Sequence, residues 1–362
     1  METGLPEVRA QIDAADDEML ALLRRRARLT AEAGKIKRAA GAKVFARPER
    51  EADILRRLAP GGGALSESSV RTIFREIISA CLALEKPQTV CYLGPPHTFT
   101  HEAARKHFGG GAQYESAETV RAVFARAEKG LCDFAVAPFE NSGEGTVGDT
   151  FEMLMETPLA VCGETTLRVR HNLLAAESPA PSEIKTIYAH PQAFAQCRRW
   201  LGENAPRAAL FPAESNAAAA RHVAENKPSG AAAIASQSAG THYRLQTVAA
   251  DIEDSADNRT RFLTLGTESP APSAADKTSF IMHMAASDRA GTLYQLLEPL
   301  SRLGVNMTKF ESRPARGKFG EYFFYVDIDG HREDAAAAQA LDEIRGRAAF
   351  LKVLGSYPRA AE

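Results

Sequence analysis

The sequence lacks the features that mark membrane-bound, secreted and zinc-binding proteins. None of its apolar runs approaches the roughly 20 residues that a membrane span requires. Its first residues, METGLPEVRAQIDAADDE, lack the basic start and apolar core of a signal peptide, so we expect a cytoplasmic protein. The five cysteines form no C-x-x-C pair, which argues against a disulfide framework and a zinc site. We therefore expect reduced, mostly buried thiols and no bound metal.

The chain also lacks a strong charge of either sign. Lys and Arg number 44 and Asp and Glu 46, so the net charge of −2 gives no electrostatic footprint for nucleic acid. The N-terminal part is nevertheless locally basic, which is typical of a site for a smaller anion. A hydrophobic fraction of 44% over 362 residues predicts a soluble globular protein of two or three domains.

Two changes of pattern divide the chain into three segments. Residues 1–88 lack strand signals and read as one long and two shorter helices, broken at RAAGAK and APGGGALSES. Residues 89–267 alternate short β-like runs with Ala-rich helical stretches, which predicts an α/β domain. After the linker TESPAPSAADKTS, residues 277–358 show the order βαββαβ, which is typical of an α+β ferredoxin-like domain.

The first helix carries a heptad seam from position 8 to position 36, and Arg26 is the one charged residue in it. A guanidinium in an apolar seam must pair with a protein carboxylate or wait for an anionic ligand. Lys37 lies about 20° around the helix and about 16 Å along it from Arg26, so these two cations could hold a small dianion between them. Arg9 is about 25 Å away from Arg26 and could join them only from a partner chain. A helix of about 45 to 50 Å is also longer than a compact domain of 88 residues would accommodate alone, so we expect an intertwined dimer.

Core-facing charges recur in the other two helices. Glu85 continues the apolar line of Phe74, Ile78 and Cys81, and Glu51 lies on an apolar stripe of the second helix. These segments resemble the all-helical chorismate mutase domain of the bifunctional chorismate mutase/prephenate dehydratase family, through VRAQIDAADDEMLALLRRRARLTAEAGKIK, RPERE and FREIISACLALE.

The resemblance implies a pericyclic rearrangement of chorismate to prephenate without a covalent intermediate. Such catalysis holds a compact conformer and stabilises the negative charge that develops on the ether oxygen. By motif position the implied site residues are Arg9 of a partner chain and Arg26 for the carboxylates, Lys37 for the ether oxygen, Arg50 and Glu51 for the ring hydroxyl end, and Cys81 and Glu85 where some relatives have Ser and Gln. Glu85 must be protonated to donate to the ether oxygen, and we expect its apolar neighbours to raise its pKa.

The middle segment resembles a two-lobed prephenate dehydratase domain through LGPPHTFTHEAA, PFENSGEGTV, YAHPQAFAQC and NRTRF. The implied reaction expels a ring hydroxide and carbon dioxide from prephenate and gives phenylpyruvate. Thr260 would direct its hydroxyl at the leaving oxygen, and Arg261 would fix the substrate's anionic end. Glu140 competes with Thr260 as proton donor, because a buried carboxyl with a raised pKa is the better acid. Other residues expected in the pocket are Thr98, Thr100, Asn141, Gln196 and Phe262.

The last segment resembles the ACT domain, whose phenylalanine-binding motifs match DRAGTLYQLL and FESRPARG. Gly291 opens a helix, where the missing side chain lets a ligand carboxylate approach the helix N-terminus. The resemblance implies feedback inhibition by L-phenylalanine at an interface between two such modules. The residues implied in that site are Gly291, Thr292, Leu293, Glu311, Ser312 and Arg313.

These expectations describe a homodimeric or higher homo-oligomeric enzyme that binds chorismate, prephenate and L-phenylalanine. We expect no metal or organic cofactor and no nucleic-acid or membrane partner. Two alternatives remain open at this point. The chain could be an amino-acid-sensing binding protein, or a dehydratase whose mutase domain is silent. Separate assays with chorismate and with prephenate distinguish all three.

Overall fold

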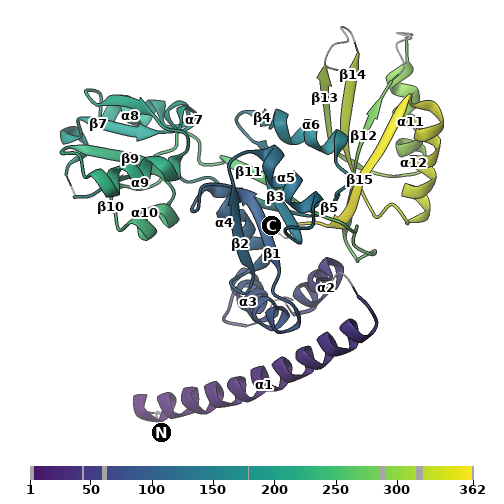
Figure 1. The fold of residues 1–362 in the computed structure, drawn as a ribbon, viewed down its shortest axis with the longest axis horizontal. Helices are drawn as coiled ribbons and strands as arrows, with labels where there is room; N and C mark the ends of the chain where they lie inside the picture. Colours follow the sequence, from purple (N-terminus) through teal and green to yellow (C-terminus); the bar gives the residue numbers. More distant parts are fainter. Residues whose placement is uncertain are drawn as a thin grey trace. The chain divides into compact units, whose positions relative to one another are not determined.

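The computed structural model describes residues 4–42, 45–58, 63–177, 179–284, 290–314 and 321–360. The chain forms two compact units, and Figure 1 shows their helices and strands. One unit consists of Met1–Gln88 with Phe108–Gln113, and the other of Thr89–His107 with Tyr114–Glu362.

No helix of these described ranges is long and apolar enough to cross a membrane. All five cysteines are buried and unpaired, as expected.

The first unit is all-helical, which confirms the prediction for this segment. Its helices are α1 (Leu5–Ala39), α2 (Pro48–Leu58) and α3 (Glu67–Glu85). Local signals explain their ends: α1 has proline in its first turn, and the Ser66 side chain caps α3 by accepting a hydrogen bond from the Ser69 amide at 3.1 Å. Near its C-terminus α1 lies against α3 so closely that a Cβ added to Gly34 would lie 3.1 Å from the Glu85 Cα.

Most of the heptad seam of α1 is exposed in the single chain. Leu22 and Ile36 retain 62% and 65% of their accessible surface, and Gly34 is the one buried residue of the helix. At 35 residues the helix is about 52 Å long. Its apolar side chains therefore lie along a face that the described part of the chain leaves uncovered. The exposed seam side chains are Val8, Ile12, Met19, Leu22, Leu29 and Ile36.

The second unit begins with a lobe built on a mixed sheet in the order β2-β1-β3-β11-β5, with β4 paired to β3. Its strands are β1 (Thr89–Leu93), β2 (Gln113–Ala117), β3 (Phe134–Asn141), β4 (Gly145–Thr146), β5 (Ala160–Arg168) and β11 (Arg259–Gly266). Its helices are α4 (Phe99–Phe108), α5 (Val120–Glu128) and α6 (Gly148–Glu156). Strand β11 pairs antiparallel with both β3 and β5, although five other strands separate it from β5 in the sequence. The chain therefore leaves this lobe after β5 and returns to its sheet with β11.

The second lobe lies between β5 and β11 in the sequence, and its sheet has the order β10-β6-β9-β7-β8. The strands are β6 (Asn172–Ala175), β7 (Thr186–Ala189), β8 (Ala209–Pro212), β9 (Ala231–Ala235) and β10 (Gln246–Ala249). The helices are α7 (Pro191–Gln196), α8 (Arg198–Asn204), α9 (Asn216–Asn226) and α10 (Gln237–Tyr243), with a short 3-10 turn at Pro181–Glu183. The expected two-lobed α/β architecture is confirmed.

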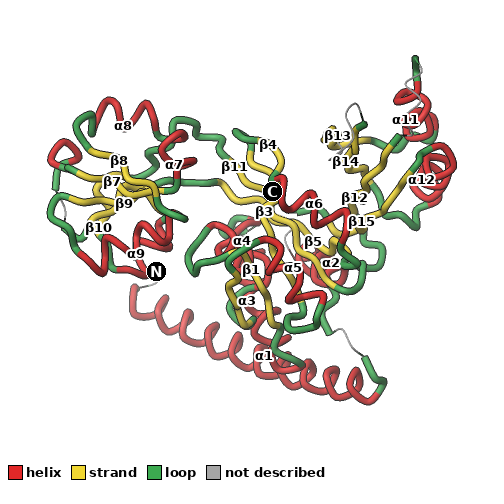
Figure 2. The backbone as a smooth tube through the Cα atoms, turned by 45° about the horizontal axis from the view of Figure 1, so that its top comes forward, coloured by secondary structure: helices red, strands yellow, loops and turns green. Residues whose placement is uncertain are grey.

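The C-terminal segment has the predicted βαββαβ order, with strands arranged β13-β14-β12-β15. Its elements are β12 (Asp276–His283), α11 (Thr292–Arg302), β13 (Met307–Pro314), β14 (Tyr322–Asp329), α12 (Ala335–Arg347) and β15 (Phe350–Pro358). Figure 2 shows α11 and α12 on the same side of this sheet, where they pack on Phe280 and Met282.

The other face of the C-terminal sheet packs against the first lobe. Because strand side chains alternate, Ile281 points away from the two helices, and it shares a buried core with Tyr325, Phe139 and Leu263. Phe139 and Tyr325 lie with their ring centroids 4.6 Å apart. The sheet that carries β3 and β11 is therefore in direct contact with the C-terminal domain.

Candidate active sites

Thr260 and Asn141 lie opposite each other at the paired ends of β11 and β3. Asn141 Nδ2 donates to Thr260 Oγ1 at 2.9 Å, and both residues are buried. The amide orientation is fixed because the Gly143 N–H donates to Asn141 Oδ1 at 2.9 Å, which leaves the NH₂ group facing Thr260. The Thr260 oxygen therefore accepts a hydrogen bond, and its own hydroxyl hydrogen is available to another acceptor.

A line of amide side chains extends from this pair toward the second lobe. Asn141 Nδ2 also donates to Asn258 Oδ1 at 2.9 Å, and Asn258 Nδ2 donates to Gln196 Oε1 at 3.0 Å. The same Gln196 oxygen lies 2.8 Å from His171 Nε2, so that nitrogen must carry the hydrogen. Burial lowers the pKa of the His171 imidazole, which keeps the ring neutral. The line thus connects a strand pair of the first lobe with α7 of the second.

Two residues of this line, Asn258 and His171, were missed in the sequence. Asn258 is the first residue of NRTRF, so its position beside Thr260 was a usable signal. His171 lies between β5 and β6, where no motif marks it. Its ring lies edge to face with Phe99 at 5.7 Å, and it has no hydrogen-bond partner for the buried Nδ1 among the described residues.

The loop LGPPHTFT meets this line through Phe99. Thr98 itself donates to the Leu93 carbonyl at 3.0 Å and closes the turn that leads into α4, and Thr100 is buried in the first turn of that helix. Phe262 is buried two residues beyond Thr260 in β11. The structure therefore gives Thr98 a turn-forming contact, in addition to any contact it makes with a substrate.

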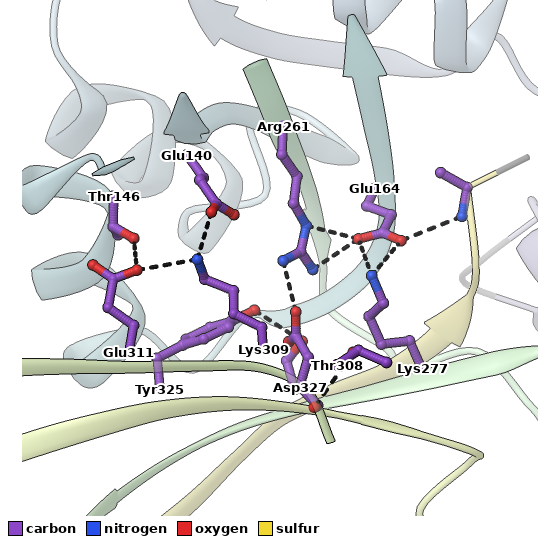
Figure 3. Close-up of polar contacts among 12 residues, drawn as sticks. Glu140, Thr146, Glu164, Arg261, Lys277, Thr308, Lys309, Glu311, Tyr325 and Asp327 are labelled. Carbon is purple, nitrogen blue, oxygen red and sulfur yellow. Dashed lines mark hydrogen bonds and ion pairs between the residues drawn. The ribbon is translucent and has the colours of Figure 1, made fainter. Parts of the chain in front are cut away.

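Glu140 and Arg261, both expected in the dehydratase pocket, point to the opposite face of the sheet. Neighbouring side chains of a strand alternate, so the residues beside Asn141 and Thr260 face the C-terminal domain. Glu140 pairs with Lys309 Nζ at 2.7 Å, and Arg261 pairs with Glu164 at 2.7 Å and with Asp327 at 2.6 Å (Figure 3). This placement supports neither Glu140 as the proton donor nor Arg261 as the anchor of the substrate's anionic end.

The helical unit gathers a second set of charges where α1 meets α3. Lys37 Nζ donates to Glu85 Oε2 at 2.6 Å and to the Phe45 carbonyl at 3.0 Å. Arg26 Nη1 donates to the Ile77 carbonyl at 3.3 Å, which links α1 to α3. The acceptor in this contact is a backbone carbonyl and not a carboxylate. Cys81 is buried one turn before Glu85. In this cluster α1 contributes two cations and α3 contributes one carboxylate.

A second carboxyl of the helical unit, Glu51 on α2, is partly buried and interacts electrostatically with Lys37 and Arg26. Burial raises the pKa of Glu51 to about 7, although Arg75, Lys37 and Arg26 pull it down. Glu85, expected as a hydrogen-bond donor to the ether oxygen, accepts the hydrogen bond from Lys37 in the single chain. Arg50 is exposed, and so is Arg9, which lies in the first turns of α1.

We expect Glu51 to give mutase activity a pH dependence. An ionised Glu51 adds negative charge to a site for a dianion, so kcat/KM for chorismate should fall, by up to about tenfold per pH unit, as pH rises above 7. The Glu51→Gln variant should lose this fall. Glu85→Gln is the matched control, because it changes a neighbouring carboxyl, and it should keep the inflection near the pKa of Glu51. An inflection that survives Glu51→Gln and disappears in Glu85→Gln would assign the titration to Glu85.

The residues expected to bind phenylalanine lie on two sides of the C-terminal sheet. Gly291 has a φ of 86° and precedes α11, whose first residues are Thr292 and Leu293. Glu311 faces the first lobe, where it accepts a hydrogen bond from Thr146 and lies 3.1 Å from Arg313 Nε. Ser312 lies between them in the strand and is exposed. Residues 288–289 and 315–317 of the two motifs lie outside the described residues.

Comparisons with known proteins agree with these three parts. Family models match residues 8–86 as chorismate mutase type II, 90–270 as prephenate dehydratase and 284–346 as ACT domain. A bifunctional chorismate mutase/prephenate dehydratase from Neisseria gonorrhoeae is 45% identical over 97% of this chain and 96% of its own.

Two solved structures resemble the chain beyond its helical unit. A prephenate dehydratase from Arthrobacter aurescens in complex with L-Phe has a TM-score of 0.68 and 33% identity, over 75% of this chain and 90% of that one. A protein described as a novel type of quorum-quenching acylase has the same TM-score and 29% identity, over 75% of this chain and 98% of its own. The bifunctional relative from Neisseria gonorrhoeae matches 97% of this chain, whereas each of the two solved structures covers 75% of it. The chain therefore belongs to the bifunctional chorismate mutase/prephenate dehydratase family and is an enzyme that carries both domains and an ACT domain in one polypeptide.

Proposed function

We propose that Thr260 is the hydrogen-bond donor to the hydroxide that leaves prephenate. The observation that supports this role is the hydrogen bond from Asn141 Nδ2 to Thr260 Oγ1. A hydroxyl that already accepts a hydrogen bond becomes a stronger donor, because the two bonds polarise each other. Its free hydrogen would stabilise the negative charge that grows on the ring oxygen as the carbon–oxygen bond breaks.

The rest of the reaction needs little acid–base chemistry from the protein. The ring carboxylate leaves as carbon dioxide, its electron pair enters the ring, and the hydroxide leaves from the opposite carbon, so aromatisation supplies much of the driving force. Asn258 and Gln196 would hold the Asn141 amide in place, and neutral His171 would complete that line. The chain thereby makes phenylpyruvate, the precursor of phenylalanine, from chorismate through prephenate.

For the mutase reaction we propose a site shared between two chains. The exposed seam of α1 needs a partner, and a second copy of the same helix offers matching apolar side chains. Arg9 lies about 25 Å along α1 from Arg26, so only the partner's Arg9 could complete the half-site of Arg26, Lys37 and Glu51. The functional unit would be a homodimer or a larger assembly of such dimers.

We also propose the domain limits 1–88, 89–267 and 277–358 and a cytoplasmic location. Residues 1–88 form most of one compact unit, and 277–358 contain the β12–β15 sheet, except Asp276 at the start of β12, together with its two helices. A pathway enzyme for small anionic substrates fits the cytoplasm, where reduced thiols such as the five here persist.

L-Phenylalanine would bind between two ACT modules and inhibit the dehydratase. Gly291 of one module would receive the ligand carboxylate at the N-terminus of α11. Glu311 and Arg313 would come from the other module, because in the single chain they face away from the α11 side of the sheet. The phenylalanine-bound dehydratase from Arthrobacter aurescens, which shares 33% identity, supports this choice of ligand.

Replacing Gly291 by alanine should weaken phenylalanine binding by about tenfold or more, because the new methyl group occupies the ligand's approach to the helix. Gly304→Ala is a matched control. Both glycines have a positive φ, 86° and 69°, and no heavy atom of a described, non-adjacent residue lies within 4 Å of a Cβ added to either. The two variants therefore carry similar backbone strain at opposite ends of α11. Calorimetry with L-phenylalanine should show the loss for Gly291→Ala alone, and equal affinities in both variants would move the site elsewhere.

A further inference from the structure

A single lysine connects the ACT sheet with the strand that carries Asn141. Lys309 Nζ lies 2.7 Å from Glu140 Oε1 and 3.1 Å from Glu311 Oε2, and its side chain is only 15% exposed (Figure 3). The Phe139 ring lies 5.9 Å from the same ammonium. Lys309 is thus shared between a carboxylate of the first lobe and a carboxylate of the ACT domain.

The strand pair that Lys309 contacts is the one that aligns Thr260, the proposed hydrogen-bond donor. Glu140 immediately precedes Asn141 in β3, and it pairs across the sheet with Arg261, the residue after Thr260. Arg261 is held in turn by Asp327 of the ACT sheet at 2.6 Å. The ACT sheet therefore forms ion pairs with both strands, at Glu140 and Arg261, one residue away from the hydrogen bond between Asn141 and Thr260. One residue of strand is only about 3.4 Å, so a shift of Glu140 moves Asn141 with it.

We infer that Lys309 is a positioning residue of the dehydratase site and the link through which the ACT domain controls it. This inference rests on the proposed regulation by L-phenylalanine. A ligand ammonium that engages Glu311 takes away one of the two carboxylates of Lys309. Lys309 then pairs with Glu140 alone. The side chain of Lys309 shifts toward Glu140, and the resulting movement of Glu140 misaligns Asn141 and Thr260. The ligand thus has a different affinity for the two arrangements of Lys309, which is what coupling between sites requires.

The test compares Lys309→Met with Lys277→Met. Lys277 is also 15% exposed and pairs with Glu164 at 2.8 Å in the same interface, but it contacts neither Glu140 nor Glu311. Glu164 also pairs with Arg261 at 2.7 Å, so Arg261 keeps both of its carboxylate partners, Glu164 and Asp327, when Lys277 is replaced. We expect Lys309→Met to lower dehydratase kcat by about tenfold to a hundredfold with KM for prephenate within about twofold. Phenylalanine should still bind Lys309→Met in calorimetry but no longer change its rate. Lys277→Met should keep its kcat and its inhibition, and mutase activity should be unchanged in both.

Two further variants keep the inference falsifiable if Lys309→Met folds poorly. Lys309→Arg preserves the charge and should restore kcat and inhibition, and Glu140→Gln should reproduce the Lys309→Met defect. In the double variant the two losses should not add, because both remove the same contact. The inference is overturned if phenylalanine inhibits Lys309→Met as it inhibits the wild type, or if Lys277→Met shows the same defect. Absence of phenylalanine binding to the wild type would refute the proposed regulation, whereas the kcat comparison would still decide the positioning role.

Discussion

Replacing Thr260 by valine is expected to lower dehydratase kcat by about 10²- to 10³-fold, the usual effect of removing one hydrogen-bond donor to developing negative charge. Valine keeps the shape and the β-branched backbone preference of threonine, so the strand should persist. It removes the hydroxyl that accepts from Asn141 and leaves that amide hydrogen without its partner. The loss should appear mainly in kcat, because the donor acts on charge that develops only as the hydroxide leaves.

Thr260→Ser is the control for this substitution, since serine keeps the hydroxyl and changes only the methyl group. It should retain most of the dehydratase turnover. Steady-state assays of prephenate consumption provide the measurement for both variants. Equal turnover by the valine variant and the wild type would remove Thr260 from the reaction and reopen the search for the donor.

Arg9→Ala and Arg26→Ala should each lower mutase activity by about a hundredfold or more, because each would leave a substrate carboxylate without its cation. Neither change should affect the dehydratase. The two inactive proteins should nevertheless complement each other if the site is shared. A heterodimer of the two variants has one site with both arginines intact and one with neither. After random subunit exchange, about a quarter of wild-type activity should return.

The complementation needs a control for exchange itself. Native mass spectrometry of the mixture shows whether heterodimers have formed, and a mixture of Arg26→Ala with Lys37→Ala should stay inactive, because both residues lie on α1 in the same half-site. Heterodimers without recovered activity would mean that each chain builds its site alone. Recovery in the Arg26→Ala and Lys37→Ala mixture would place those two residues on different chains of the site.

The periodicity of the sequence predicted the fold because it reflects burial directly. The seam of α1, the alternation of β12 and the stripe of α11 each repeat with the period of their element. Alternation could not show that β11 returns to the sheet of β3, because that pairing joins strands more than a hundred residues apart. It also could not show which face each residue of NRTRF presents, since that depends on the register of β11 against β3 and on the shift between Arg261 and Phe262.

The candidate sites were predictable in composition but not in geometry. Thr260 and Asn141 are in contact and Gln196 joins them through Asn258, while Glu140 and Arg261 face the ACT domain. His171 was missed because a lone histidine between two strands has no local pattern. The pKa of Glu51 is raised because burial outweighs the opposing charges of Arg75, Lys37 and Arg26, and only the packing of the three helices creates that burial.

One chain carries both activities, and we expect Thr260 to act in only the second. This expectation is tested most directly by supplying chorismate to the wild type and to Thr260→Val and following chorismate, prephenate and phenylpyruvate over time. The wild type should convert chorismate through prephenate to phenylpyruvate. The variant should consume chorismate at the wild-type rate and accumulate prephenate. Formation of phenylpyruvate by the variant at the wild-type rate, or failure of the wild type to consume chorismate, would contradict the account.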